Sequence, residues 1–294
     1  MERYSMKTIL ITGGAGSVGK ELTFKLVAQG HRVRVFDLPI CDYSELEHQA
    51  GIEIFKGDIR DPGLVQDAVR GTDIVLHLAA ILPPASERDR ARTFGVNVEG
   101  TQRVVEAIQQ TGGTSRLIFA SSVATYGDTT ASTPPIRVDH PQRPIDIYGE
   151  SKVAAEQVIL QAGIPYTILR ISGIVIPALM DPPDPYPFTA QQRIELVCRA
   201  DVVTALLAAV DNDAAAGKIL NIAGGPSWQM YGHEYVEKVF PILDIPIEDA
   251  HYREEPGWSD WYDTAESQAL LAYQNTPFEL YLEQLEKAVL EALG

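Results

Sequence analysis

A tyrosine and a lysine four residues apart, Tyr148 and Lys152, are the residues of this chain best suited to do chemistry. In a helix this spacing places both side chains on one face, one turn apart. A phenol has an ordinary pKa of about 10, and a neighbouring ammonium lowers that pKa by favouring the phenolate. Such a tyrosine could take the proton from a secondary alcohol while hydride leaves the same carbon. An exposed helix face often has the same spacing, so the pair needs support from the rest of the chain.

A glycine-rich turn near the start of the chain predicts a dinucleotide site. Gly13, Gly16 and Gly19 stand between an apolar strand and a helix. Gly13 permits a tight turn, Gly16 lets the backbone approach a pyrophosphate, and Gly19 allows close packing of helix and sheet. Free N–H groups at the start of the helix, at Ser17 and Val18, would bind the anion. A glycine-rich turn without a ligand is the alternative.

An aspartate at the end of the second expected strand indicates which dinucleotide the site would bind. Asp37 follows the last glycine at the distance where dinucleotide-binding folds place a ribose-binding carboxylate. A carboxylate accepts hydrogen bonds from ribose hydroxyls and repels a 2′-phosphate, so the prediction is NAD over NADP. An ordinary exposed aspartate at a strand end is the alternative.

Strands and helices alternate along the chain, which favours a parallel sheet covered on both faces. Strands are expected at residues 7–12, 32–37, 52–55, 73–78, 117–121, 166–170 and 219–222. We therefore predict a doubly wound α/β (Rossmann) fold with a seven-stranded parallel sheet and a small C-terminal substrate-binding lobe.

The expected domain boundaries follow from this pattern. Residues 1–170, with 194–223 returning to the sheet, would form the NAD-binding domain. Residues 171–193 and 224–294 would form the substrate-binding lobe. The proline-rich residues 177–187 fit either an interdomain linker or a loop beside the active site, and a strand expected at 193–198 favours the loop.

Composition and charge exclude several classes of partner. A formal net charge of −16 opposes binding to nucleic acids and to anionic membrane surfaces. The two cysteines, Cys41 and Cys198, have no paired spacing, and no metal site is readable. The polar residues 1–7 do not resemble a signal peptide, and no apolar run is long enough to span a bilayer. We expect a cytoplasmic enzyme that acts on a small molecule, without a metal.

These segments together resemble the extended short-chain dehydrogenase/reductase superfamily, in its NAD-dependent epimerase/dehydratase family. The turn at 12–19 and the pair Tyr148 and Lys152 carry the resemblance. Further matching segments follow in the family's order, at residues 57–59, 77–80, 96–101, 120–127, 221–225 and 261–264.

The resemblance implies roles for individual residues. Tyr148 would be the acid/base, Lys152 would lower its pKa and bind the nicotinamide ribose, and Ser122 would hydrogen-bond the reacting oxygen. The further cofactor contacts that it implies are Asp58, Ile59, Leu78, Ala79, Ala80 and a structural asparagine, Asn97. It also implies a homodimer formed by helices at 97–109 and 148–160, although the apolar residues of these helices could instead face the sheet.

Departures from the family's pattern narrow the substrate. Val123 and Ala124 stand where the sugar-nucleotide dehydratases have an Asp-Glu pair, so elimination of water is not expected. The segment after the sixth strand is short, which favours a substrate smaller than a nucleotide sugar. Arg193 or Arg199 could bind a carboxylate or phosphate, or be surface charges. Tyr126 could line the substrate or pack in the core.

The leading hypothesis is an NAD-dependent oxidoreductase that transfers hydride at a secondary alcohol or ketone carbon of a sugar, sugar acid or other small polar substrate. An NAD-dependent sugar or nucleotide-sugar epimerase with tightly bound NAD would use the same residues. An NAD-sensing regulatory protein is a third reading, which the retention of Ser122, Tyr148 and Lys152 disfavours.

Overall fold

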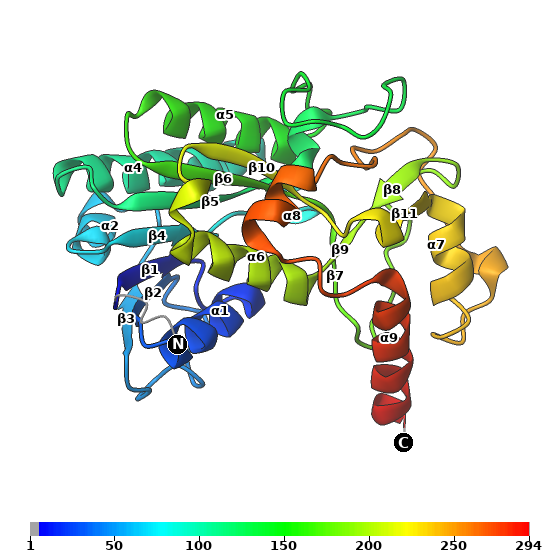
Figure 1. The fold of residues 1–294 in the computed structure, drawn as a ribbon, viewed down its shortest axis with the longest axis horizontal. Helices are drawn as coiled ribbons and strands as arrows, with labels where there is room; N and C mark the ends of the chain where they lie inside the picture. Colours follow the sequence, from blue (N-terminus) through cyan, green and yellow to red (C-terminus); the bar gives the residue numbers. More distant parts are fainter. Residues whose placement is uncertain (1–5, 294) are drawn as a thin grey trace. The chain divides into compact units, whose positions relative to one another are not determined.

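The structure, a computed structural model, describes residues 6–293 (Figure 1). Residues 1–5, part of the polar start where no signal peptide is expected, and Gly294 lie outside the described residues. The chain divides into two compact units. The first unit runs to Ser121 and includes Asp146–Leu169 and Ala205–Ile219. The second unit contains Ser122–Ile145, Arg170–Thr204 and the chain from Leu220 onward.

A seven-stranded sheet with the order β10-β6-β5-β4-β1-β2-β3 forms the centre of the first unit. Its strands are β1 (Thr8–Thr12), β2 (Arg32–Asp37), β3 (Ile52–Lys56), β4 (Ile74–His77), β5 (Arg116–Ser122), β6 (Tyr166–Ile171) and β10 (Lys218–Ile222), of which β5, β6 and β10 end in the second unit. β1 pairs in parallel with β2 and with β4, so the strand order reverses at β1. Doubly wound folds bind ligands at this reversal, beyond the carboxyl ends of the strands. The predicted seven-stranded Rossmann sheet is confirmed.

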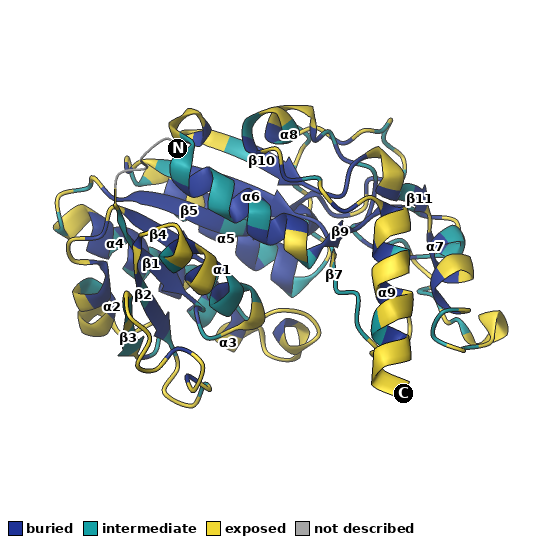
Figure 2. Cartoon of the chain, turned by 60° about the horizontal axis from the view of Figure 1, so that its bottom comes forward, coloured by how far each residue is buried: buried dark blue, intermediate teal, exposed yellow. Residues whose placement is uncertain are grey.

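Helices cover both faces of this sheet (Figure 2). The helices that contribute to the first unit are α1 (Ser17–Ala28), α2 (Pro62–Val69), α3 (Arg90–Phe94), α4 (Gly100–Gln110), α5 (Ile147–Gln161) and part of α6 (Arg199–Asp211). Apolar residues of α2, α4 and α5 pack together with the strands in one core. Consecutive residues of β1, Ile9, Leu10 and Ile11, are fully buried, as expected for a strand covered on both faces.

The apolar residues of α4 could face either the sheet or a dimer partner, and the structure decides between these two alternatives. Val104, Val105 and Ile108 belong to the core of the first unit and are at most 2% exposed. These side chains therefore face the sheet rather than a partner. Val153 of α5 is only half-buried. The homodimer remains a prediction.

The second unit has its own core, which is rich in aromatic residues. Trp228, Phe278 and Tyr281 pack with ring centroids 4.9 to 6.1 Å apart. Its helices and strands are β7 (Ile174–Val175), β8 (Arg193–Glu195), β9 (Val197–Cys198), the start of α6, β11 (Gln229–Tyr231), α7 (Gly232–Val239), α8 (Ala265–Leu271) and α9 (Phe278–Leu293). The assignment of substrate binding to this part of the chain remains a prediction.

The strand expected at 193–198 is two strands in the structure. β8 pairs antiparallel with β11, and β9 pairs in parallel with β7. Leu196 lies between them, at the point where the chain leaves one ladder for another. The strand is divided because its two halves pair with different strands, β11 and β7. The apolar pattern of residues 193–198 does not indicate this change of partner.

Within residues 6–293, every helix is too short or too polar to cross a membrane.

Candidate functional site

The glycine-rich turn packs closely against the ends of β1, β2 and β4. Gly13 has a positive φ of 71°, and a side chain there would meet the backbone nitrogen of Ala79 at 2.8 Å. A Cβ at Gly19 would meet the Gly13 carbonyl oxygen at 2.6 Å, which explains why helix and turn approach so closely. At Gly16 the only near atom is the Gly13 oxygen, at 3.3 Å. The absent Gly16 side chain therefore leaves room for a ligand above the start of α1.

The N-terminus of α1 is suited to bind an anion. Its N-cap, Gly16, has no side chain to cap the first N–H groups, and the first turn contains no acidic residue. Ser17 is exposed and Val18 is half-buried. The unpaired N–H groups and the helix dipole give this end partial positive charge.

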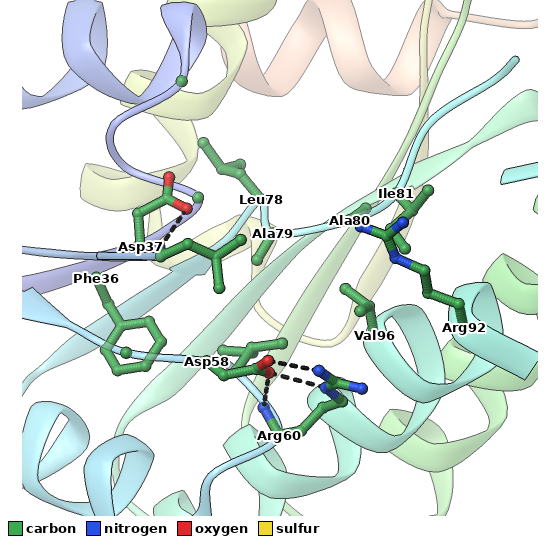
Figure 3. A pocket seen from close by; sticks show the side chains of 15 residues that line it. Phe36, Asp37, Asp58, Arg60, Leu78, Ala79, Ala80, Ile81, Arg92 and Val96 are labelled. Carbon is green, nitrogen blue, oxygen red and sulfur yellow. Dashed lines mark hydrogen bonds and ion pairs between the residues drawn. The ribbon is translucent and has the colours of Figure 1, made fainter. Parts of the chain in front are cut away.

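A cavity of about 340 Å³ opens beside this turn, and all its lining residues belong to the first unit (Figure 3). Asp37 lines it at the end of β2. The Asp37 carboxylate accepts hydrogen bonds from the N–H groups of Ala15, at 3.1 Å, and Leu38, at 2.8 Å. These bonds hold the carboxylate between the turn and the cavity.

The segment after β3 forms the opposite wall of the cavity. The Asp58 carboxylate is held by the Arg60 guanidinium at 2.9 and 2.6 Å, and these bonds lower the pKa of Asp58. Ile59 is buried and would meet any side chain added at Gly100 of α4 at 2.7 Å. This contact fixes the distance between the wall and the helix.

The segment after β4 forms the floor. Leu78, Ala79 and Ala80 line the cavity and are half-buried. Below them His77 is fully buried between Thr12 and Thr101, at 2.6 and 2.9 Å. Burial lowers the pKa of His77 to about 3, so the ring is neutral. His77 holds β4 to β1 and α4, a structural role.

Asn97 lies in one π-helical turn, Gly95–Glu99, between α3 and α4. Its amide oxygen accepts from the Ile81 N–H at 2.7 Å, and its nitrogen donates to the Ile81 carbonyl and to Ser151. Ser151 in turn donates to the Tyr148 carbonyl at 2.7 Å. Asn97 thus positions Ile81, which lines the cavity, and the helix turn that carries Tyr148.

Tyr148 and Lys152 lie on one face of α5, as their spacing predicts. The Lys152 ammonium is 5.7 Å from the centre of the Tyr148 ring and 4.7 Å from that of Phe119. It donates to the Ala120 carbonyl at 2.8 Å. Asp146 caps the start of this helix by accepting from the Gly149 N–H at 2.7 Å.

Burial lowers the pKa of Lys152 to about 7, although the nearby Glu156 carboxylate opposes this shift. Glu156 is fully buried one turn further along α5 and accepts a hydrogen bond from Ser121. The lysine is therefore poised between its charged and neutral forms near neutral pH. Strongly shifted pKa values of buried groups cluster at functional sites.

Ser122 is the last residue of β5 and belongs to the second unit. It is buried, and its hydroxyl oxygen accepts from the Ala124 N–H at 3.1 Å, which starts a short 3₁₀ turn, Val123–Tyr126. The hydroxyl hydrogen can still be donated elsewhere.

Two candidate substrate residues are built into the second unit. Tyr126 is buried, and its hydroxyl donates to Asn221 at 2.7 Å and accepts from Arg170 at 3.0 Å. Arg193 forms a two-bond ion pair with the buried Asp260, at 2.6 and 2.9 Å. Arg199, the third candidate, is the first residue of α6 and is half-buried.

The family of the chain follows from a comparison with known proteins. The NAD dependent epimerase/dehydratase family matches residues 9–185, more than half of the chain. The chain belongs to this family. The predicted resemblance is confirmed, and so is NAD as the cofactor, because the family is NAD-dependent.

The proteins that are similar to this chain in sequence include a dehydrogenase and an epimerase. The chain is 35% identical over 182 residues to a 3-beta-hydroxysteroid dehydrogenase of Mycolicibacterium neoaurum, covering 58% of this chain and 49% of that protein. It is 34% identical over 173 residues to a UDP-glucose 4-epimerase of Lactobacillus helveticus, covering 56% of this chain and 51% of that protein. The chain thus matches only about half the length of these curated relatives.

Solved structures of the same fold cover nearly the whole chain. A short-chain dehydrogenase/reductase superfamily protein of Agrobacterium tumefaciens with bound NAD has a TM-score of 0.80, with 24% identity, over 97% of this chain and 98% of that one. The Bordetella bronchiseptica enzyme WbmG, in complex with NAD and UDP, has a TM-score of 0.81, with 23% identity, over 99% and 96%. At this identity the likeness shows the fold alone.

The structure adds residues to the cavity beyond the cofactor contacts predicted from the sequence, and of these Gly57 and Val96 lie within the matching segments 57–59 and 96–101. Phe36, Leu38, Gly57, Arg60, Ile81, Arg92 and Val96 also line it. Most of them are neighbours of predicted residues, so the motifs could have been read one residue wider. Arg92 belongs to no motif, and only the fold brings it to the cavity. In the part of the chain that the structure describes, no group of three or more His, Cys, Asp or Glu side chains is arranged to hold a metal.

Proposed function

We propose that this member of the family is an NAD-dependent oxidoreductase that transfers hydride at a secondary alcohol or ketone carbon of a small polar substrate, such as a sugar or sugar acid. The observation that supports it most is the buried Lys152 beside Tyr148 on a helix of the same unit as the cavity beside the glycine-rich turn. Burying an ammonium group costs free energy that an apolar side chain would not, so a buried lysine at this position favours a functional role.

The residues around the cavity fit NAD. Gly13, Gly16 and the first N–H groups of α1 would hold the pyrophosphate, and Asp37 would accept from the adenosine ribose. Asp58, Ile59, Leu78, Ala79 and Ala80 would enclose the adenosine, with Asn97 holding Ile81 in place. When bound, NAD supplies the hydride acceptor or donor of the reaction.

The remaining chemistry belongs to the protein. Tyr148 would take the proton of the substrate hydroxyl, and Lys152, when charged, would lower the pKa of the phenol and bind the nicotinamide ribose. Ser122 would donate its hydroxyl hydrogen to the reacting oxygen. Holding these groups in fixed positions would lower the barrier further.

The contacts of Arg193 in the second unit disfavour this arginine as a ligand for an anionic group of the substrate. Arg193 is paired with Asp260, and its guanidinium also donates to the carbonyls of Thr130 and Ser132. Binding a carboxylate or phosphate through this arginine would require breaking the pair. We therefore assign Arg193 a structural role.

An epimerase that keeps NAD bound throughout the reaction is the second candidate, because UDP-glucose 4-epimerases are among the relatives at 34% identity. It would use the same Tyr148 and Lys152. A purely regulatory role is the third candidate function. We also propose that the protein is a homodimer and is located in the cytoplasm.

The test is to measure bound nucleotide in the purified protein and then follow absorbance at 340 nm with excess NAD⁺ and candidate sugars, sugar acids and alcohols. Stoichiometric NADH with one class supports a dehydrogenase. Altered stereochemistry without net NADH supports the epimerase. Affinity for NAD without turnover of any substrate supports the regulatory reading, and no affinity for NAD or NADH contradicts the proposal.

A further inference from the structure

Two guanidinium groups line the cavity of the first unit, and they differ in their partners. Arg60 is held in a two-bond ion pair by Asp58, at 2.9 and 2.6 Å. Its charge is therefore balanced within the wall of the cavity. Arg60 is suited to shape this wall rather than to bind an additional anion.

Arg92 is the second guanidinium. It lies on the short helix α3, where its backbone N–H donates to the helix cap, Asp89, at 2.9 Å. Figure 3 shows its side chain extending into the cavity toward Ala80 and Ile81. Among residues 6–293 no carboxylate pairs with this guanidinium. The neighbouring Arg90 instead pairs with Glu150 and covers the ring of Phe94.

The other charged side chains near the cavity do not balance the negative charge that a bound pyrophosphate would bring. Asp37 adds a carboxylate to the lining. Lys20, on the second turn of α1, is paired with Glu45 at 3.0 Å. The positive end of α1 and the Arg92 guanidinium therefore remain to balance the pyrophosphate of a dinucleotide.

We infer that Arg92 is a cofactor-binding residue that forms a charge-assisted hydrogen bond with the pyrophosphate of NAD. A guanidinium presents paired N–H donors that match phosphate oxygens. Its position on α3, across the cavity from the glycine-rich turn, lets the anion be held from two sides. The inference rests on the proposed cofactor site and adds a residue that no motif of the chain indicates.

Binding measurements test this inference without relying on turnover. The dissociation constants of NADH, ADP and adenosine are compared for the wild-type protein and for Arg92→Ala. We expect NADH and ADP to bind about tenfold more weakly, because a hydrogen bond to a charged group is lost, and adenosine to change less than twofold. The loss should shrink at high salt. Arg92→Lys should recover part of the affinity, since it restores the charge but not the fork.

The matched control is Arg90→Ala, which removes a neighbouring guanidinium that does not line the cavity. It should leave all three dissociation constants unchanged. Equal binding of NADH and ADP by wild type and Arg92→Ala, or an equal loss for adenosine, would overturn the inference alone. A wild-type protein that binds neither NADH nor ADP would overturn the proposed function itself.

Discussion

Charged side chains serve different purposes in the two units of this protein. In the first unit Asp37 and Arg92 face a cavity of about 340 Å³. In the second unit comparable groups are satisfied by each other: Arg193 by Asp260, and the hydroxyl of Tyr126 by Arg170 and Asn221. The same residue types therefore line a cavity in one unit and hold the scaffold together in the other.

The difference is clearest at buried ionisable groups. Lys152 donates to a backbone carbonyl, and its burial lowers its pKa to about 7. Glu195 of the second unit accepts from the N–H groups of Gly225 and Tyr262 and from the Gln229 amide. Burial raises the pKa of Glu195 to about 7, although these donors oppose the shift. Glu195, which accepts from several donors, holds the loops that carry those donors together. Lys152 lies beside Tyr148 and is placed where it can influence that phenol.

Replacing one tyrosine in each unit should give the largest contrast. Tyr148→Phe removes the proposed proton acceptor, so turnover should fall about 10³-fold, within the range for general acid–base catalysis, while NADH binding changes less than twofold. Steady-state rates at 340 nm and a fluorescence titration measure the two effects.

Tyr126→Phe is the control in the second unit. It should retain turnover and lower the free energy of unfolding by about 1 to 2 kcal/mol, because Asn221 and Arg170 each lose their buried hydrogen bond to the Tyr126 hydroxyl. Full activity of Tyr148→Phe would end the catalytic assignment, and a lost activity of stably folded Tyr126→Phe would restore its substrate role.

Arg193→Met should test whether this arginine is structural. The change leaves the Asp260 carboxylate buried and unpaired, so the free energy of unfolding should fall by about 3 kcal/mol, as for other broken buried pairs. Chemical denaturation measures the loss, and Arg193→Met with Asp260→Leu should recover part of it. Unchanged stability together with a raised KM would instead make Arg193 a substrate ligand.

Lys152→Met should change how stability depends on pH. Because burial lowers the pKa of Lys152 to about 7, the folded protein releases this proton between about pH 7 and pH 10 while the unfolded chain still holds it. The wild type should therefore gain about 3 kcal/mol relative to the variant as pH rises through this window. Denaturation at pH 6.5 and 9.5 gives the difference.

Lys287→Met is the surface control, since Lys287 is 76% exposed beside Glu291. It should show no such gain. A parallel pH dependence for wild type and Lys152→Met would mean that the buried lysine keeps an ordinary pKa.

Asp37→Asn should have the smallest effect, on the choice of cofactor. It removes the charge that repels a 2′-phosphate but keeps an oxygen that can accept from the Ala15 or Leu38 N–H. The ratio of NADPH to NADH affinity should rise about tenfold. If the wild type already binds NADPH more tightly than NADH, the assignment of Asp37 is wrong.

Much of the first unit was predictable because its signals are local. The spacing of Gly13, Gly16 and Gly19 follows from the demands of one turn, and the structure has Gly13 and Gly19 at the close contacts expected there and open space beside Gly16. The apolar strands of a parallel sheet and the one-turn spacing of Tyr148 and Lys152 are likewise properties of short segments. For this reason the family, the Rossmann sheet and the cofactor could be predicted from the sequence.

What the sequence did not determine is which distant group each charged side chain meets. The sequence leaves Arg193 open as an anion ligand or a surface charge, and in the structure it pairs with Asp260, 67 residues away along the chain. Arg92 was not expected at all, yet the fold brings it to the cavity. The sequence by itself determined the fold, the cofactor and the positions of the motifs, because local geometry encodes them. Only the tertiary structure decided which charged side chains pair with each other and which line the cavity, because charge pairing depends on neighbours that the folded chain brings together.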